Sequence, residues 1–127
     1  MGAEIREINR HTPDWIEFSD GLRYLGGLRR GRPNGSGRGE AADGAKYCGE
    51  WRNGQRHGEG AMIWPDGSRY VGNWQNGRRS GYGVMLWPGG DKYVGSWHND
   101  KRHGIGTMTR ADGTQYMGRW EHDIPAE

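Results

Sequence analysis

The apolar positions of this chain recur at a fixed interval of 23 residues. Each recurrence is a five-residue segment in which Tyr, Gly and Trp alternate with two variable residues, as in Tyr70-Val71-Gly72-Asn73-Trp74. Because successive side chains of a β-strand point to opposite faces, the Tyr, Gly and Trp are predicted to share one face of a strand. The segment occurs at residues 47–51, 70–74, 93–97 and 116–120, and residues 24–28 match it with Leu28 in place of Trp.

A second alternating segment lies before each of these and ends at a turn. From Gly58 to Trp64 every second residue is Gly, Gly, Met and then Trp, and residues 81–87 repeat the order. The intervening Pro65-Asp66-Gly67 supplies the preset φ and the positive φ of a tight turn. Each 23-residue unit is therefore predicted to be one β-hairpin.

A fixed period of this length indicates stacked units that bury surface only against their neighbours. We predict an all-β fold, an elongated single-layer antiparallel solenoid of about five 23-residue hairpin repeats. Glycine at the strand centres would let aromatic rings of a neighbouring unit lie across bare backbone. The predicted organisation is a degenerate half-repeat or N-terminal cap over residues 1–14, a ribbon over 15–120 with hairpins at about 15–28, 36–51, 59–74, 82–97 and 105–120, and a C-terminal tail over 121–127.

Composition changes this picture in one respect. The 127 residues include 25 Gly, 7 Trp and 6 Tyr but only 14 Leu, Ile, Val or Phe, too few for an aliphatic core. That composition alone favours disorder, but the net charge is only +2 and the aromatic residues keep a fixed phase. No run of about 18 apolar residues and no signal peptide is found, so we expect a cytoplasmic protein.

Catalysis, a cofactor and a bound metal are not expected. His57 and His103 fall in the predicted turns between hairpins, about 20 Å apart by strand spacing, whereas zinc ligands lie within a few Å of each other. We expect these two rings to bond to nearby backbone groups, and His98 and His122 to be solvated. Equivalent positions in adjacent units are about 10 Å apart, and no unit contains a nucleophile, a base and an orienting acid together.

Residues 28–39 resemble an arginine-glycine RNA-binding tract. The repeat already accounts for Gly31, Gly35 and Gly37, and no helix follows to present its N-terminus to a phosphate. We therefore do not expect nucleic-acid binding.

Two surfaces are candidates for binding. The aromatic row first packs the sheet, but a single layer cannot cover both faces, so part of the row is expected to form a groove for a partner helix or peptide. The inter-hairpin turns would form a basic edge that steers an acidic partner or anionic lipid, opposite an acidic edge at Asp20, Asp43, Asp66, Asp91 and Asp112. The predicted groove comprises Tyr47, Trp51, Met62, Trp64, Tyr70, Trp74, Met85, Trp87, Tyr93, Trp97, Met108, Tyr116 and Trp120, and the basic edge Arg56, Arg78, Arg79, Lys101 and Arg102.

The ends of the ribbon are a third candidate. No further hairpin follows Trp120, so the last strand is predicted to present an open edge. The start of the chain adds either half a unit or, from the spacing of Ile5 and Ile8, a helical turn. Pairing of terminal strands would give a homodimer or capture a strand of another protein.

The repeat resembles the MORN family, the membrane occupation and recognition nexus repeats, whose unit reads roughly Tyr-x-Gly-x-Trp, x-x-Gly, x-x-His-Gly-x-Gly. Residues 49–60 reproduce most of it, and the resemblance covers about residues 15–120. This chain departs from the pattern at Leu28, Asn34, Gly39, Ser80 and Asp100. The resemblance implies roles in cytoskeletal, ciliary or sperm-flagellar assemblies, or in tethering membranes and signalling complexes.

The sequence thus predicts a non-catalytic protein-protein interaction scaffold, associated with the cytoskeleton or peripheral at a membrane. A partner helix or peptide would bind in the aromatic groove. The alternative is a peripheral module that binds anionic phospholipid headgroups through its basic edge.

Overall fold

The computed structural model describes residues 5–8 and 15–126, and every regular element in them is a β-strand. All twelve strands belong to one antiparallel sheet, in which each strand pairs with its neighbours in sequence. The strands are β1 (Ile5–Ile8), β2 (Ile16–Phe18), β3 (Arg23–Arg29), β4 (Arg32–Glu40), β5 (Lys46–Arg52), β6 (Gln55–Ile63), β7 (Arg69–Gln75), β8 (Arg78–Leu86), β9 (Lys92–His98), β10 (Lys101–Thr109), β11 (Gln115–Glu121) and β12 (Ile124–Ala126).

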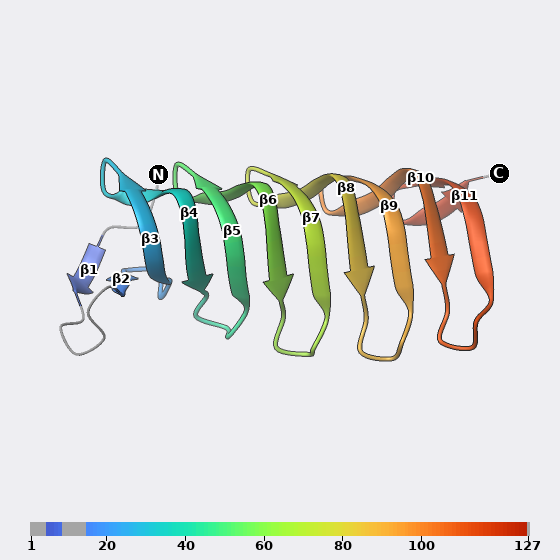
Figure 1. The fold of residues 1–127 in the computed structure, drawn as a ribbon, viewed down its shortest axis with the longest axis horizontal. Helices are drawn as coiled ribbons and strands as arrows, with labels where there is room; N and C mark the ends of the chain where they lie inside the picture. The colour runs from blue at the N-terminus through green and yellow to red at the C-terminus, as the bar shows by residue number, and fades with distance from the viewer. Residues whose placement is uncertain (1–4, 9–14, 127) are drawn as a thin grey trace.

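The strands lie side by side in an elongated ribbon that does not close on itself (Figure 1). Longer turns, such as residues 64–68 between β6 and β7, form one edge, and we call these the intra-hairpin turns. Shorter turns, such as residues 76–77 between β7 and β8, form the other edge and are called the inter-hairpin turns. The all-β, single-layer repeat fold predicted from the sequence is confirmed, and Ile5–Ile8 forms a strand rather than a helical turn.

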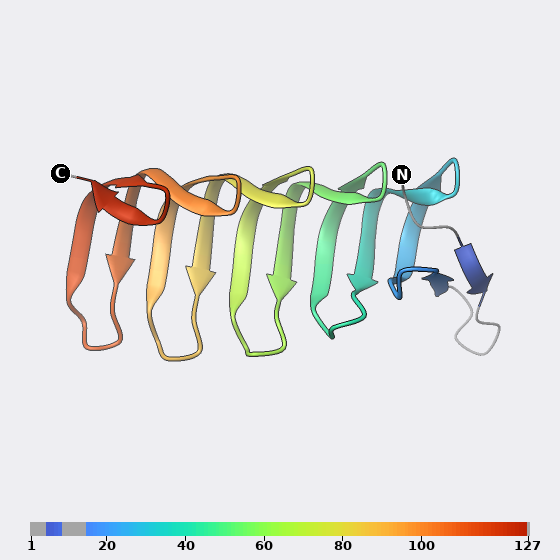
Figure 2. The same ribbon diagram turned by 180° about the vertical axis from the view of Figure 1, so that it is seen from behind.

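A bulge bends every second strand pair near the inter-hairpin turn. Between β5 and β6, Gly49 pairs with Gly60 but Trp51 pairs with Arg56, so β6 carries two extra residues. Gly58 lies in this bulge with a φ of 72°, which a side chain tolerates poorly. The same two-residue bulge occurs in the pairing of β7 with β8 and of β9 with β10. The inter-hairpin turns consequently fold over toward one face of the sheet (Figure 2).

The core consists of rings on that face rather than aliphatic side chains. Trp51, Trp74, Trp97 and Trp120 each make edge-to-face contacts with the Tyr of their own strand and with the Tyr of the preceding repeat. Trp74, for example, lies 5.1 Å from Tyr70 and 5.5 Å from Tyr47. Such pairs each contribute about 0.5–1.5 kcal/mol beyond the burial of their surface. The contacts form one continuous ladder, in the order Tyr24, Trp51, Tyr47, Trp74, Tyr70, Trp97, Tyr93, Trp120 and Tyr116.

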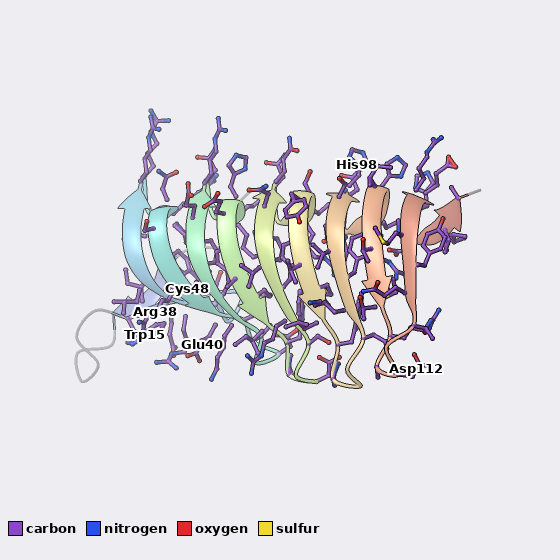
Figure 3. The ribbon with its side chains drawn as sticks, turned by 45° about the vertical axis from the view of Figure 1, so that its right-hand side comes forward. Trp15, Arg38, Glu40, Cys48, His98 and Asp112 are labelled. Carbon is purple, nitrogen blue, oxygen red and sulfur yellow. The ribbon has the colours of Figure 1, made fainter. Side chains whose placement is uncertain are left out.

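The opposite face carries the variable residues of the strands. Val71 is 60% exposed and Met117 is 73% exposed, and Cys48, at the equivalent repeat position, is exposed as well. Arg38 pairs with Cys48 across β4 and β5, where both are labelled in Figure 3. The described residues include no helix long and apolar enough to span a membrane.

Candidate functional site

The aromatic face is more deeply buried than the sequence suggested. Ten of the thirteen residues predicted to line a groove are buried, and only Trp64, Trp87 and Tyr116 are partly exposed. The row is therefore mainly a core, and a partner could reach it chiefly at Trp64 and Trp87. Whether a partner binds there stays a prediction. The ten buried members are Tyr47, Trp51, Met62, Tyr70, Trp74, Met85, Tyr93, Trp97, Met108 and Trp120.

Hydrogen bonds hold these rings in place. The Trp74 indole donates to the carbonyl of Gly60 at 3.2 Å, and the Tyr70 hydroxyl donates to the carbonyl of Asn73 at 3.0 Å. The Tyr70 ring also covers Gly83 on the next strand so closely that a Cβ there would collide with it. The predicted packing of aromatic rings on glycine is confirmed for Tyr70. Burial raises the pKa of the Tyr93 hydroxyl to about 12.

Arginines at three equivalent positions lie across the aromatic face. The Arg79 guanidinium is 4.7 Å from the Trp97 ring and 5.4 Å from the Trp64 ring, and its side chain is only 19% exposed. Its Nε lies 3.1 Å from the Asp100 carboxylate, and one terminal nitrogen donates to the Asp100 carbonyl. Arg102 repeats these contacts with Trp120, Trp87 and Asp123.

These contacts correct the predicted basic edge. Arg56, Arg79 and Arg102 turn inward and connect neighbouring repeats, because each pairs with a Trp of the aromatic face on the adjacent strand. Arg78 and Lys101, each one position earlier, are exposed. The sequence contained one signal of this arrangement. Asp100 stands where the repeat has Gly, and in the structure its carboxylate pairs with Arg79, 21 residues earlier.

The exposed positive charge gathers elsewhere along the inter-hairpin turns. Arg29, Arg30 and Arg32 are all exposed at the turn between β3 and β4, and with Asn53 they border an open hollow of about 490 Å³. Toward the C-terminal end the positions equivalent to Arg29 and Arg30 hold His98 in one turn and His122 in the next, and the exposed Lys or Arg beside these turns is Lys101 (Figure 3 labels His98). The charge of this edge therefore falls along the ribbon.

The aspartates of the intra-hairpin turns act locally. The Asp66 carboxylate accepts a hydrogen bond from the Ser68 amide at 2.8 Å, and Asp112 accepts one from Thr114 in the same way. These bonds lower the pKa of both carboxyl groups. The predicted acidic edge thus consists largely of carboxylates that stabilise turns, as at the lower turn where Figure 3 labels Asp112.

The histidines are arranged differently from the prediction. His57 and His103 lie within β6 and β10 rather than in turns. His98 and His122 flank His103, with ring centroids 5.8 Å and 5.2 Å from it, and His103 accepts a hydrogen bond from the His122 amide. The Nδ1 of His57 is buried without a hydrogen-bond partner, so the expected backbone bond is wrong there. Within the described part of the chain, no group of three or more metal-binding side chains is arranged to hold an ion.

Two hollows open on the aromatic face. One, of about 540 Å³, lies beside Trp87, Arg102 and Trp120 near the C-terminal end. The other, of about 270 Å³, lies beside Trp51, Arg56 and Met62. Both contain an Arg from the inward-facing set together with aromatic or Met side chains. Besides the partly exposed Trp64, these hollows are where another molecule could reach the buried row.

The C-terminal edge of the sheet is only partly covered. β12 pairs with β11 at residues 119–121 alone, so residues 115–118 of β11 have no second neighbour within residues 15–126. Tyr116 is correspondingly less buried than Tyr93, although its hydroxyl donates to the Ala126 carbonyl. Strand pairing at this edge, with a second copy or with another protein, stays a prediction.

The model of the MORN repeat family matches residues 24–45, 47–69, 70–92 and 93–115. The chain belongs to the MORN-repeat family. Repeats of this family are modules that bind proteins or lipids rather than enzymes. A comparison with curated proteins gave no match.

Proposed function

We propose that this chain is a non-catalytic scaffold that binds a helix or an extended segment of another protein along its aromatic face. The observation that carries the proposal is the position of Trp87, which stays partly exposed beside the hollow that contains Arg102. Trp64 is likewise partly exposed and lies against Arg79. Partly buried aromatic residues next to arginine are typical of the residues that dominate the affinity of protein interfaces. A cytoplasmic, ciliary or flagellar cytoskeletal assembly is the setting we propose, and it rests on the family resemblance.

A second candidate, anionic lipid binding, has its own supporting observation. Arg29, Arg30 and Arg32 are exposed together and border one hollow, whereas Arg79 and Arg102 already hold carboxylates. Attraction to an anionic membrane contributes about 1 kcal/mol for each basic residue near the surface. The lipid hypothesis therefore moves from the whole basic edge to its N-terminal end.

Crosslinked pulldown from native lysate and liposome flotation separate the two functions. One variant carries Arg29→Glu, Arg30→Glu and Arg32→Glu, and a second carries Trp87→Ala with its folding checked by thermal melting. The scaffold proposal expects one dominant protein partner, rebinding as a purified protein, which is lost in Trp87→Ala and kept in the triple variant. Salt-sensitive flotation that is lost in the triple variant, without a protein partner, would instead establish the lipid function.

A further inference from the structure

The three inward-facing arginines share one geometry. In each, a terminal nitrogen donates to the carbonyl of the residue 21 positions later, at 2.8 Å for Arg56, 3.1 Å for Arg79 and 3.0 Å for Arg102. Each also faces the Trp 18 positions later, and for Arg56 this is Trp74 at 4.8 Å. Because the three sites are otherwise equivalent, a contact that two of the arginines make and the third does not marks an unfilled position at the third site.

Arg56 lacks two contacts that the other two arginines make. Where Asp100 provides a carboxylate to Arg79, the equivalent residue facing Arg56 is Gly77, and no carboxylate of the described residues forms an ion pair with Arg56. Where Trp64 covers Arg79, the equivalent residue is Ala41. Both differences remove atoms that contact the guanidinium in the Arg79 site.

The hollow of about 270 Å³ lies where those atoms are missing. Ala41, Ala42 and Ala45 form its apolar part, and Arg56 and Gly77 its polar part. Its size is just below the range of about 300–1,000 Å³ for small-molecule pockets, which suits one or two side chains of a partner. Burial lowers the pKa of Arg56, an indication that its charge is poorly compensated within this chain.

We propose that this hollow is a recognition site for an acidic segment of a partner protein, with one aromatic side chain in the space above Ala41 and an adjacent Asp or Glu carboxylate on the Nε of Arg56. The site rests on the proposed scaffold function and specifies the chemistry of the partner. The partner would supply what Trp64 and Asp100 supply to Arg79 within the chain itself.

The surroundings of Arg56 favour a side-chain carboxylate over a phosphate. One guanidinium is available, and both of its terminal nitrogens already donate, one to the Gly77 carbonyl and the other to the Met62 sulfur. Asp20 also lines the hollow. A phosphate group carries more negative charge and more acceptor oxygens than this set of donors could satisfy. A carboxylate needs only the open side of one Arg.

The test uses the full chain and three small probes: indole-3-acetate, its neutral amide and acetate. Binding is followed by the nuclear magnetic resonance signals of the Arg56 Nε–H and of the Gly77 and Ala42 amides. Indole-3-acetate is expected to shift all three signals saturably, and the amide and acetate are each expected to bind at least about tenfold more weakly, because each lacks one half of the recognised group. Equal affinity for the acid and the amide, or no saturable shift at Arg56, would overturn the proposal.

Two variants close the hollow with residues that the chain uses elsewhere. Gly77→Asp places a carboxylate at a φ of 83°, close to the 71° that Asp100 adopts at the equivalent position. Ala41→Trp restores the ring. Each variant is expected to keep or raise the melting temperature and to weaken the binding of indole-3-acetate at least about tenfold. The control, Gly89→Asp, adds the same charge as Gly77→Asp at an open position away from Arg56 and should bind indole-3-acetate as the parent does. Parent-like binding by Gly77→Asp and Ala41→Trp would reject the site.

Failure of this inference is distinct from failure of the scaffold proposal. A purified protein partner that binds the Gly77→Asp variant as tightly as the parent, but loses affinity for Trp87→Ala, would reject the Arg56 site and keep the scaffold. Absence of any protein that binds the aromatic face would reject the scaffold, while the probe titration would still report on Arg56.

Discussion

The guanidinium carbon of Arg79, on β8, lies 4.7 Å from the centroid of the Trp97 ring, on the next strand, β9. The contact places a cation over a ring that already makes edge-to-face contacts with Tyr70 and Tyr93. Because Asp100 holds the other side of the same guanidinium, Arg79 joins successive hairpins. The arginines therefore belong to the structure of the repeat as much as the aromatic residues do.

Loss of the Arg79 side chain should destabilise the protein, whereas loss of its neighbour should not. We expect Arg79→Ala to lower the free energy of unfolding by about 2 kcal/mol, from the lost cation–π contact and charged hydrogen bonds, discounted because Asp100 is partly exposed. Arg79→Lys should recover only part of this, since an ammonium cannot reproduce the planar contacts. Urea denaturation measures both, with the exposed Arg78→Ala as a control expected within about 0.5 kcal/mol of the parent. Equal effects of Arg78→Ala and Arg79→Ala would contradict the packed position of Arg79.

Gly83 and Gly89 form a matched pair that tests how far the aromatic rings depend on bare backbone beneath them. A Cβ at Gly83 would collide with the Tyr70 ring, which is fully buried and cannot move aside, so Gly83→Ala should cost about 3 kcal/mol. A Cβ at Gly89 would meet no atom within 4 Å, so Gly89→Ala should be neutral or stabilise by about 0.5 kcal/mol through the unfolded chain. Thermal melting of the two variants gives the comparison. Similar melting temperatures would show that the rings do not depend on the bare backbone.

High pH should unfold the ladder. Burial raises the pKa of Tyr93 from 10.0 to about 12, and it raises those of Tyr47 and Tyr70 as well. A raised folded-state pKa means that the protonated hydroxyl stabilises the native state fully below about pH 10, and that this stability is lost as the pH rises toward 12. Ultraviolet absorbance of tyrosinate and circular dichroism should therefore change together in this range. Ionisation of all six tyrosines near pH 10 in a folded protein would be inconsistent with the buried rings.

Acid should weaken the intra-hairpin turns. Hydrogen bonds from Ser68 lower the folded-state pKa of Asp66, so its carboxylate contributes stability above the unfolded value of about 3.9, and this is lost as the pH falls through the folded value. Asp66→Asn should reduce this acid dependence while keeping an acceptor in the turn. Melting temperatures between pH 2 and pH 6 measure the difference. Parallel pH profiles for Asp66→Asn and the parent would rule out this contribution.

The sequence predicted the strands and the aromatic face because both follow from a strict period. Tyr70, Gly72 and Trp74 share a face by strand alternation, and Gly83 predicted close packing of a ring. The inward direction of Arg79 was missed because the repeat pattern predicted a turn at residues 78–79. They belong to β8, where alternation places Arg79 on the face of Met85 and opposite Trp74. The depth of burial was also missed, since the folded-over inter-hairpin turns cover a face that a flat ribbon would expose.

The most direct test of the scaffold is a photo-crosslink from the aromatic face. Trp87 is replaced by p-benzoylphenylalanine, which keeps an aromatic ring at a partly exposed position, and a control carries it at Val71, which is 60% exposed on the opposite face. After irradiation in native lysate, position 87 should yield one protein adduct that excess unmodified chain competes away, and position 71 should not. The same adducts from both positions, or phospholipid adducts from position 87 with no protein among them, would contradict binding of a protein partner along the aromatic face.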